Sequence, residues 1–241
     1  MFTITLIGPD GTGKSTIIKM LQSSLPVPTK YIYMGINLEA SNFMLPTTWL
    51  WYKIKHASGR ELAMGGPPDP SRIQPIPNKN FLKRIAREIK SGLRMANLMA
   101  EEWFRQLIAW YFQACGYIVI FDRHFYFDYH KHHIADISAG RTIGDRVHGL
   151  MLNHIFPKPD LVICLDAPAE VLFSRKGEGT VELLEQRRKE YLQVQHVVER
   201  FVTVDATQSM SEVARQVTNL VMDFYLMKNS AAGASSKLRT K

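Results

Sequence analysis

Five short runs of apolar residues, rich in β-branched side chains, recur along the 241-residue chain. They span residues 2–7, 30–34, 117–121, 161–165 and 201–204. Continuous apolar runs of this length are typical of parallel strands, because helices cover both faces of such strands and leave no polar side. We therefore expect five buried strands.

Longer segments with a helical spacing of apolar residues separate these runs. They span residues 15–23, 80–113, 143–156, 169–173, 178–199 and 209–227. The alternation of strands and helices predicts an α/β fold, with a doubly wound five-stranded parallel sheet flanked by helices. Ligands of such sheets bind at the carboxyl ends of the strands, so the functional residues are expected there.

Three segments do not fit this alternation. Residues 57–79 are rich in proline and glycine, which predicts a flexible insertion that is either a lid over a substrate or a passive loop. The aromatic stretch 45–56 before it either packs against the core or lines a pocket. Residues 229–241 are small and polar, which predicts a disordered tail after a single domain over 1–228.

The composition narrows the classes of function. No apolar run reaches the roughly 18 residues that a membrane span needs, so we expect no membrane contact. The two cysteines, Cys115 and Cys164, lie in or beside apolar runs, which is typical of reduced thiols in a cytoplasmic protein. The net charge of +8 favours an anionic ligand, and no stretch interleaves basic and aromatic residues as a nucleic-acid surface would.

Residues 8–16, Gly-Pro-Asp-Gly-Thr-Gly-Lys-Ser-Thr, match the phosphate-binding pattern G-x-x-x-x-G-K-[ST]. Their place between a strand and a helix is the context that this chemistry needs, since the glycines let backbone N–H groups point at a polyphosphate. Lys14 can reach the β- and γ-phosphates, and the Ser15 hydroxyl can hold Mg²⁺. The alternative is a glycine turn with a surface lysine, but the motif and its context favour a nucleoside-triphosphate site.

The third apolar run is followed by Asp122, Arg123 and His124. A carboxylate at the carboxyl end of a strand beside the phosphate loop can hold Mg²⁺ or act as a general base. Arg123 can bind a phosphate or a sugar hydroxyl. The alternative is that Asp122 and Arg123 form only a surface ion pair at the end of the strand.

These motifs resemble those of thymidylate kinases and related deoxynucleoside kinases. Residues 8–16 resemble the phosphate loop of thymidylate kinases, and residues 116–124 resemble the strand that ends in their Asp-Arg-aromatic motif. Residues 159–170 look like the fourth strand of that family with its turn, and residues 201–206 like the last strand and the loop beside the adenine. The resemblance covers residues 1–34 and 115 to about 227, and it implies a P-loop NTPase fold and a kinase that uses ATP and Mg²⁺.

The resemblance also implies roles for particular residues. Asp122 and Arg123 would face the reacting phosphoryl group and its acceptor, with Ser15 and Asp122 at the metal. Asp128 matches a second acid of the deoxynucleoside kinases, or is a surface residue of a helix. ATP and Mg²⁺ would be bound by the loop residues Gly8, Asp10, Gly11, Thr12, Gly13, Lys14, Ser15 and Thr16.

A mobile lid is expected over 174–190, because phosphoryl transfer needs cations that arrive with the substrate. The phosphate loop has no arginine of its own, so a lid arginine would supply the positive charge. Arg175 is the first candidate, and Arg187 and Arg188 are the next. The alternative is a solvated helix face whose charges pair with one another.

Two acceptor-binding elements of thymidylate kinases are missing. Residues 33–39 replace an Arg-Glu-Pro-Gly element, and Ala100 and Glu101 stand where an Asp-Arg pair is expected on the long helix. The acceptor site would then have to be rebuilt from other charged residues. Candidates are Glu39, Arg94, Glu101, Glu102 and Arg105.

Three hypotheses for the function remain open. The first is an ATP-dependent phosphotransferase that acts on a nucleoside monophosphate, with dTMP as the first choice. The second is a kinase of a nucleoside or another small metabolite, and the third is a silent nucleotide-binding regulator.

Two further expectations concern assembly and metal binding. Aromatic residues on the helix 80–113 suggest a homodimer. The lysine within the cluster 130–133 argues against a metal site there.

Overall fold

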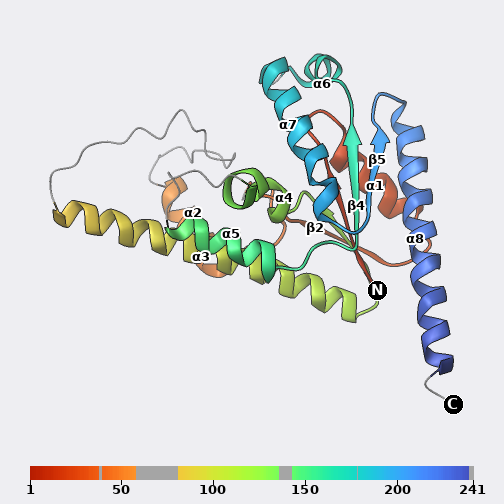
Figure 1. The fold of residues 1–241 in the computed structure, drawn as a ribbon, viewed down its shortest axis with the longest axis horizontal. Coiled ribbons are helices and arrows are strands. Elements are labelled where there is room, and N and C mark those ends of the chain that lie inside the picture. Colours follow the sequence, from red (N-terminus) through yellow and green to blue (C-terminus); the bar gives the residue numbers. More distant parts are fainter. Residues whose placement is uncertain (38–39, 58–80, 136–142, 178, 239–241) are drawn as a thin grey trace. The chain divides into compact units, whose positions relative to one another are not determined.

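A computed structural model describes residues 1–37, 40–57, 81–135, 143–177 and 179–238 (Figure 1). Side chains are not described at 51, 55–56, 81–91, 132 and 231–238. The chain divides into two compact units, which are described separately. Unit 1 comprises Met1–Tyr31, Gly116–Asp122 and Pro159–Lys241, and unit 2 comprises Ile32–Cys115 and Arg123–Lys158. The single domain over 1–228 stays a prediction.

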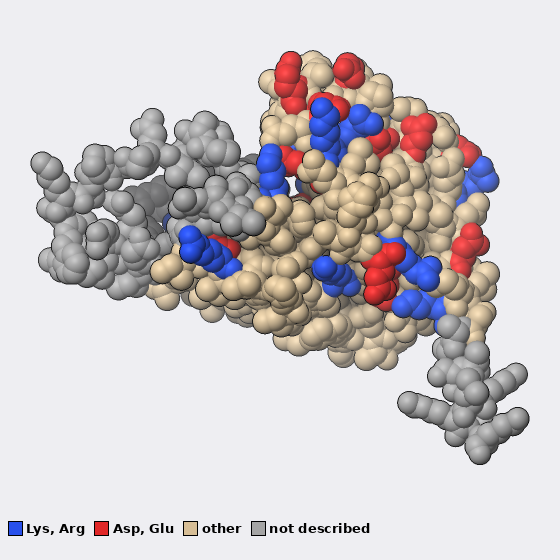
Figure 2. Space-filling view, viewed as in Figure 1, with Lys and Arg blue, Asp and Glu red and all other residues tan. Residues whose placement is uncertain are grey.

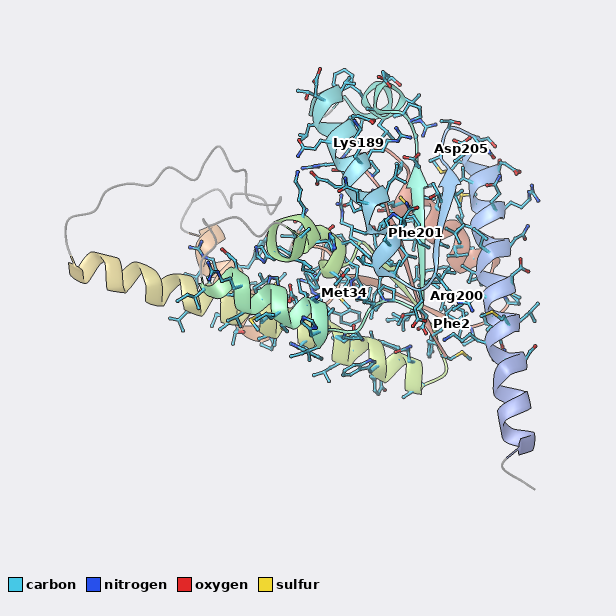
Figure 3. All side chains as sticks on the ribbon, viewed as in Figure 1. Phe2, Met34, Lys189, Arg200, Phe201 and Asp205 are labelled. Carbon is cyan, nitrogen blue, oxygen red and sulfur yellow. The ribbon has the colours of Figure 1, made fainter. Side chains whose placement is uncertain are left out.

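The five predicted strands form one parallel sheet. They are β1 (Thr3–Ile7), β2 (Thr29–Tyr33), β3 (Ile118–Asp122), β4 (Leu161–Asp166) and β5 (Phe201–Asp205), in the order β2-β3-β1-β4-β5. Each strand begins and ends within one residue of its predicted run. Figure 3 labels Phe2 and Arg200 at the amino ends of β1 and β5 and Asp205 at the carboxyl end of β5. The α/β fold with a five-stranded parallel sheet flanked by helices is therefore confirmed.

The order of the strands fixes where a ligand can bind. The chain leaves β1 toward β2 and β3 on one side and later continues to β4 and β5 on the other. In open α/β sheets this reversal opens a crevice at the carboxyl end of the strand where it occurs. The segment after β1 contains the phosphate-binding motif, so the motif occupies the position that the topology favours.

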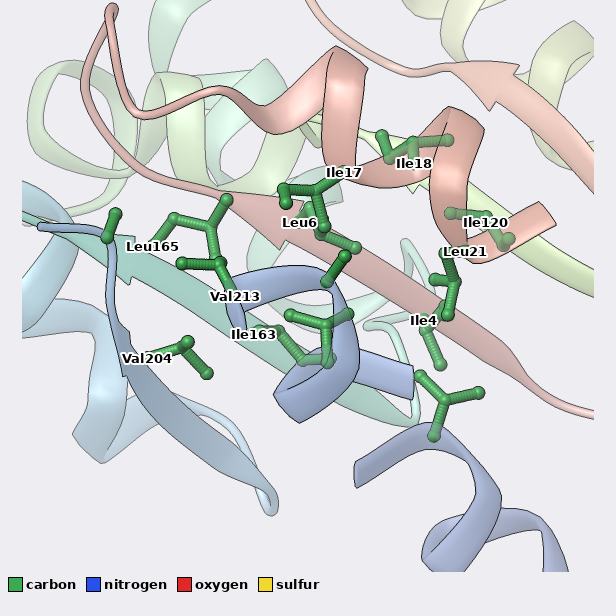
Figure 4. Close-up of a cluster of buried hydrophobic side chains, with 14 of the residues drawn as sticks. Ile4, Leu6, Ile17, Ile18, Leu21, Ile120, Ile163, Leu165, Val204 and Val213 are labelled. Carbon is green, nitrogen blue, oxygen red and sulfur yellow. The ribbon is translucent and has the colours of Figure 1, made fainter. Parts of the chain in front are cut away.

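Unit 1 has its core between the sheet and two helices. Its helices are α1 (Lys14–Ser24), α6 (Ala169–Lys176), α7 (Val181–Gln193) and α8 (Met210–Leu238), with a 3-10 turn over Val194–Val197. Figure 4 shows Ile17 and Leu21 of α1 and Val213 of α8 packed on Leu6 and Ile163 of the sheet. These five side chains are at most 2% exposed, so apolar burial holds the segment of the phosphate motif in place.

The helix α8 is longer than its predicted span. It continues to Leu238, through residues 229–238 where the composition predicts a disordered tail, and residues 239–241 lie outside the described part of the chain. Alanines and lysine in this stretch have good helix propensity, which extends a helix whose first turns are already packed.

Unit 2 is mainly helical. It contains α2 (Pro46–Ala57), α3 (Phe81–Ala114), α4 (Phe125–Tyr129), a π-helix over His130–Ala135 and α5 (Ile143–His154). The sequence predicts α3 and α5 but treats α2 only as an aromatic stretch. Of the insertion predicted over 57–79, residues 58–79 lie outside the described residues. In the part of the chain that the structure describes, none of the helices combines the length and the apolar character of a membrane span.

Candidate functional site

The segment after β1 forms a tight loop with three left-handed glycines. Gly8, Gly11 and Gly13 have φ angles of 137°, 91° and 84°. A Cβ atom at Gly8 would lie 2.3 Å from the carbonyl oxygen of Leu165, so only glycine fits where the loop passes β4. Gly13 is also the N-cap of α1, which leaves the first backbone N–H groups of that helix at the loop. The sequence prediction of a glycine cradle at a helix start is thus realised in the backbone.

Lys14 lies folded over this loop. Its Nζ donates hydrogen bonds to the carbonyl oxygens of Gly8 at 2.8 Å and Pro9 at 2.7 Å, and the residue is 7% exposed. Thr12 is buried, and its hydroxyl donates to the Pro9 carbonyl at 3.0 Å. An ammonium group bound to neutral carbonyls gains more from a polyphosphate, because hydrogen bonds between two charged groups are stronger. Lys14 is therefore placed to bind an anion at the loop.

Ser15 and Asp122 are brought into contact. The Ser15 hydroxyl donates to Asp122 Oδ2 at 2.8 Å, and the hydroxyl of Tyr31 lies 3.3 Å from the same oxygen. The parallel register pairs Leu6 with Asp122, which places the end of β3 beside the loop. A hydroxyl and a carboxylate oxygen are ligands that Mg²⁺ accepts, so these two residues fit the metal site that the sequence predicts. Tyr31 was not predicted there.

Arg123, which follows Asp122, is the only non-glycine residue with a positive φ angle, 65°, among the described residues. A non-glycine residue in this left-handed region costs of order 1–3 kcal/mol and persists only where the surroundings fix it. Such residues cluster at functional sites. The backbone geometry therefore adds a structural sign of function that the sequence did not show.

The helix α7 directs one arginine at the phosphate loop. Arg187 Nη1 donates to Asp10 Oδ2 at 3.0 Å, and both side chains are about one-third exposed. Its neighbour Arg188 donates two hydrogen bonds to the carboxylate of Asp166 at the end of β4, at 2.6 and 2.9 Å. These bonds raise the pKa of Arg188 above its usual value. Arg188 thus anchors α7, and Arg187 lies beside the loop.

Arg175, the first lid candidate, has different partners. Its Nη1 donates to the carbonyl oxygen of Ala206 at 2.7 Å, and its Nη2 to that of Thr207 at 3.4 Å. These carbonyls belong to the turn after β5. Figure 2 shows acidic and basic side chains mixed over the part of unit 1 that carries α6 and α7. The role of Arg175 stays a prediction, and so does that of Arg187, which the contact with Asp10 supports.

Two of the acceptor candidates on α3 form a buried ion pair. Arg105 donates from Nε and Nη2 to Glu101 Oε1 at 3.0 and 2.9 Å, and both residues are at most 2% exposed. The other oxygen of Glu101 accepts from the backbone N–H of Leu45 at 2.9 Å. The i, i+4 spacing of this pair was a visible signal, but the sequence did not show that the pair would be buried.

Glu102 belongs to a second buried network of unit 2. His148 Nε2 lies 2.9 Å from both carboxylate oxygens of Glu102, and His148 Nδ1 lies 2.6 Å from Nδ1 of His133. Burial raises the pKa of Glu102, and the contact with His148 opposes that shift. His133 of the cluster 130–133 therefore binds another histidine of the protein.

The remaining candidates are more dispersed. Arg94 is exposed on α3, and Asp128 is half-buried on α4. Glu39 lies outside the described residues. Acceptor recognition therefore stays a prediction for Arg94 and Glu39, and the match of Asp128 to a second acid stays a prediction too.

Comparison with known proteins gives partial matches that include two probable thymidylate kinases. No family model matches the chain. The chain is 31% identical over 111 residues to a probable thymidylate kinase 1 of Saccharolobus solfataricus, and the match covers 43% of this chain and 54% of that protein. It is 32% identical over 123 residues to a probable thymidylate kinase of Archaeoglobus fulgidus, covering 48% of this chain and 59% of that protein. The chain thus matches somewhat more than half the length of these relatives, and its resemblance to a thymidylate kinase-like P-loop kinase is confirmed.

Proposed function

We propose that the protein is an ATP-dependent phosphotransferase, a kinase that transfers the γ-phosphate of ATP to a small acceptor. The observation that carries the proposal is the phosphate loop after β1, with the Ser15 hydroxyl 2.8 Å from Asp122 at the end of β3. The two similar proteins, both named as probable thymidylate kinases, support the same reaction class. A nucleoside monophosphate is the first candidate for the acceptor, and dTMP is the first compound to test.

The donor end follows from the loop. The β- and γ-phosphates of ATP would lie against the backbone N–H groups of residues 8–16, at the positive end of the dipole of α1. Lys14 would exchange the carbonyls of Gly8 and Pro9 for phosphate oxygens. Ser15 and Asp122 would hold Mg²⁺, which neutralises negative charge on the phosphates when it is bound.

The acceptor end has fewer assigned residues. Arg123 would position the acceptor, and Asp122 would either hold the metal or take a proton from an acceptor hydroxyl. A cation from the predicted lid, 174–190, would stabilise the charge that develops on the transferred group. The contact of Arg187 with Asp10 supports Arg187 for this role, and Arg175 remains a candidate.

A kinase of a nucleoside or another small metabolite is the second candidate. It is favoured by one observation on the acceptor side. Arg105 and Glu101, which could have replaced the missing acceptor elements, are buried and bound to each other. A nucleotide-binding regulator without kinase activity is the third candidate, and the contact between Ser15 and Asp122 argues against it.

The deciding experiment measures ADP release with ATP and Mg²⁺ across nucleoside monophosphates, nucleosides and sugars. Stimulation by dTMP or a related monophosphate supports the nucleotide kinase, and stimulation only by a nucleoside or a sugar supports the second candidate. ATP binding without stimulation by any acceptor would instead favour the regulator. A homodimer and a cytoplasmic location are also proposals, and sedimentation of the purified protein tests the dimer.

The variant Lys14→Ala tests the proposed ATP site. We expect it to lower acceptor-stimulated ADP release by at least about a hundredfold, because it removes a preorganised cation from the transferred group. Lys19→Ala is the control, since Lys19 is exposed on the same helix. Circular dichroism should show the same fold in both variants. Full activity in Lys14→Ala would contradict the proposed donor site.

A further inference from the structure

A buried arginine of unit 2 fixes the turn that follows β2. Arg105 is fully buried, and its Nη1 donates to the carbonyl oxygens of Tyr33 at 3.2 Å and Gly35 at 3.0 Å. The rest of its guanidinium is bound to Glu101. The guanidinium group is planar and rigid. Its hydrogen bonds therefore hold the backbone of the turn at a defined distance and orientation relative to α3.

Gly35 leaves the space that two neighbouring side chains use. A Cβ atom at this position would lie 2.8 Å from Cδ of Arg123 and 2.6 Å from the hydroxyl oxygen of Tyr33. Both distances are shorter than side-chain contacts allow, so Arg123 and Tyr33 would have to move. The backbone of Gly35 does not lie in the left-handed region, so alanine would fit the backbone itself. Glycine is therefore needed at this position to leave room for Arg123 and Tyr33, and not because of its backbone angles.

Arg123 has little freedom to adapt. Its left-handed φ of 65° sets the direction in which its side chain leaves the backbone. The aliphatic part of the side chain then passes over Gly35, while Arg105 keeps the turn from moving away. The aliphatic stem of Arg123 therefore lies directly against the turn at Gly35.

We propose that Gly35 is a positioning residue for the phosphate acceptor, which acts by keeping Arg123 in place. The proposal rests on the proposed function, in which Arg123 contacts the anionic or hydroxyl oxygens of the acceptor. It assigns a specific role to the turn that stands where thymidylate kinases have Arg-Glu-Pro-Gly. In this chain Gly35 leaves room for the side chain of Arg123, and Arg123 provides the positive charge.

The first test needs no activity. The Nε–H resonances of arginine side chains are recorded in the wild type, Gly35→Ala and Gly92→Ala, and the Arg123 signal is assigned by its loss in Arg123→Lys. Gly92 is the control, because a Cβ atom there meets none of the described residues within 4 Å. We expect the Arg123 signal to shift in Gly35→Ala and to stay in place in Gly92→Ala. An unchanged signal in Gly35→Ala would overturn the proposed contact.

The second test separates the acceptor from the donor. With the acceptor that stimulates ADP release most, and dTMP first, Gly35→Ala should lower kcat/KM for the acceptor by about ten- to a hundredfold, as expected for a misplaced binding group. The KM for ATP should change less than about twofold, because the phosphate loop is untouched. A purely structural role would instead lower the melting temperature and affect both substrates alike.

The outcomes distinguish the two proposals. An active wild type with unchanged acceptor kinetics in Gly35→Ala overturns the role of Gly35 and leaves the kinase assignment standing. An equal loss for ATP and acceptor also overturns that role. A wild type that is inactive with every acceptor overturns the proposed function and the role of Gly35 with it.

Discussion

At the residue scale, two arginines of the predicted lid region differ in what holds them. Arg187 forms an ion pair with Asp10 of the phosphate loop, about one-third exposed on both sides. Such exposed pairs are worth at most about 1 kcal/mol, so a phosphate can displace the carboxylate easily. Arg175 instead donates to two backbone carbonyls of the turn after β5.

We therefore predict that Arg187→Ala impairs transfer more than Arg175→Ala does. With ATP and the best acceptor, kcat should fall by at least about tenfold in Arg187→Ala, because the cation that we propose for the transferred group is lost. Lys189→Ala is the control, since Lys189 is 69% exposed on the same helix. A larger loss of kcat in Arg175→Ala would place the functional cation on α6 and contradict this ranking.

The sequence identifies candidate residues most directly where they are local to one motif. Lys14 and Ser15 follow from the order of strand, turn and helix, and Asp122 follows from the end of the next strand in the sheet. The partner of Arg187 could not be predicted, because Asp10 lies 177 positions away and no local spacing links the two. The positive φ of Arg123 is likewise a product of tertiary packing.

At the element scale, the strands and helices that were predicted are those with a clear local pattern of apolar residues. The strands are continuous apolar runs, and their ends follow closely from composition. The apolar residues of α2 are not buried as a stripe, since Trp49, Leu50 and Ile54 are 48%, 55% and 62% exposed. Its helical period was therefore hidden among the aromatic residues. The short α4 and the π-helix after it are too brief for a periodic signal.

Packing between α5 and the π-helix gives a sharp prediction for Gly149. A Cβ atom at Gly149 would lie 2.0 Å from the carbonyl oxygen of His133, which is backbone and cannot rotate away. Gly149→Ala should therefore destabilise the protein by about 1–3 kcal/mol through overpacking. The midpoint of urea unfolding measures the change.

Gly92→Ala controls for the change in helix propensity. Gly92 lies on α3, where a Cβ atom has no neighbour within 4 Å in the part of the chain that the structure describes, so alanine there should raise stability by about 0.5–1 kcal/mol. Two variants with the same chemical change should then shift the midpoint in opposite directions. A stabilising effect at both positions would show that α5 and the π-helix are not packed as closely as the structure indicates.

At the scale of the whole molecule, one carboxylate joins three distant parts of the chain within unit 1. Asp160 accepts hydrogen bonds from the backbone N–H and the hydroxyl of Thr3, at 2.8 and 3.0 Å, at the start of β1. Its other oxygen accepts from Lys228 of α8 at 2.8 Å. The first strand, the turn before β4 and the last helix thus meet at a single side chain.

The stability of the protein should depend on the charge of Asp160. Partial burial raises the pKa of this carboxyl, but the hydrogen bonds from Lys228 and Thr3 outweigh it and bring the pKa below the usual 3.8. A folded-state pKa below the unfolded value means that the contribution to stability is present above about pH 4 and is lost as the pH falls through the folded pKa. The contribution of Asp160 to the free energy of unfolding therefore changes with pH only in the acid range.

Asp160→Asn tests this dependence. At pH 7 we expect the variant to lose about 1.5–3 kcal/mol of unfolding free energy, the range for hydrogen bonds to a charged group. The difference from the wild type should be smaller at pH 3, because below about pH 4 the unfolded wild-type chain takes up a proton at Asp160 more readily than the folded protein does. Asp223→Asn controls for the removal of an exposed carboxylate from α8. A difference that stays constant from pH 7 to pH 3 would mean that Asp160 acts through its shape alone, and that its charge does not help to join β1 to α8.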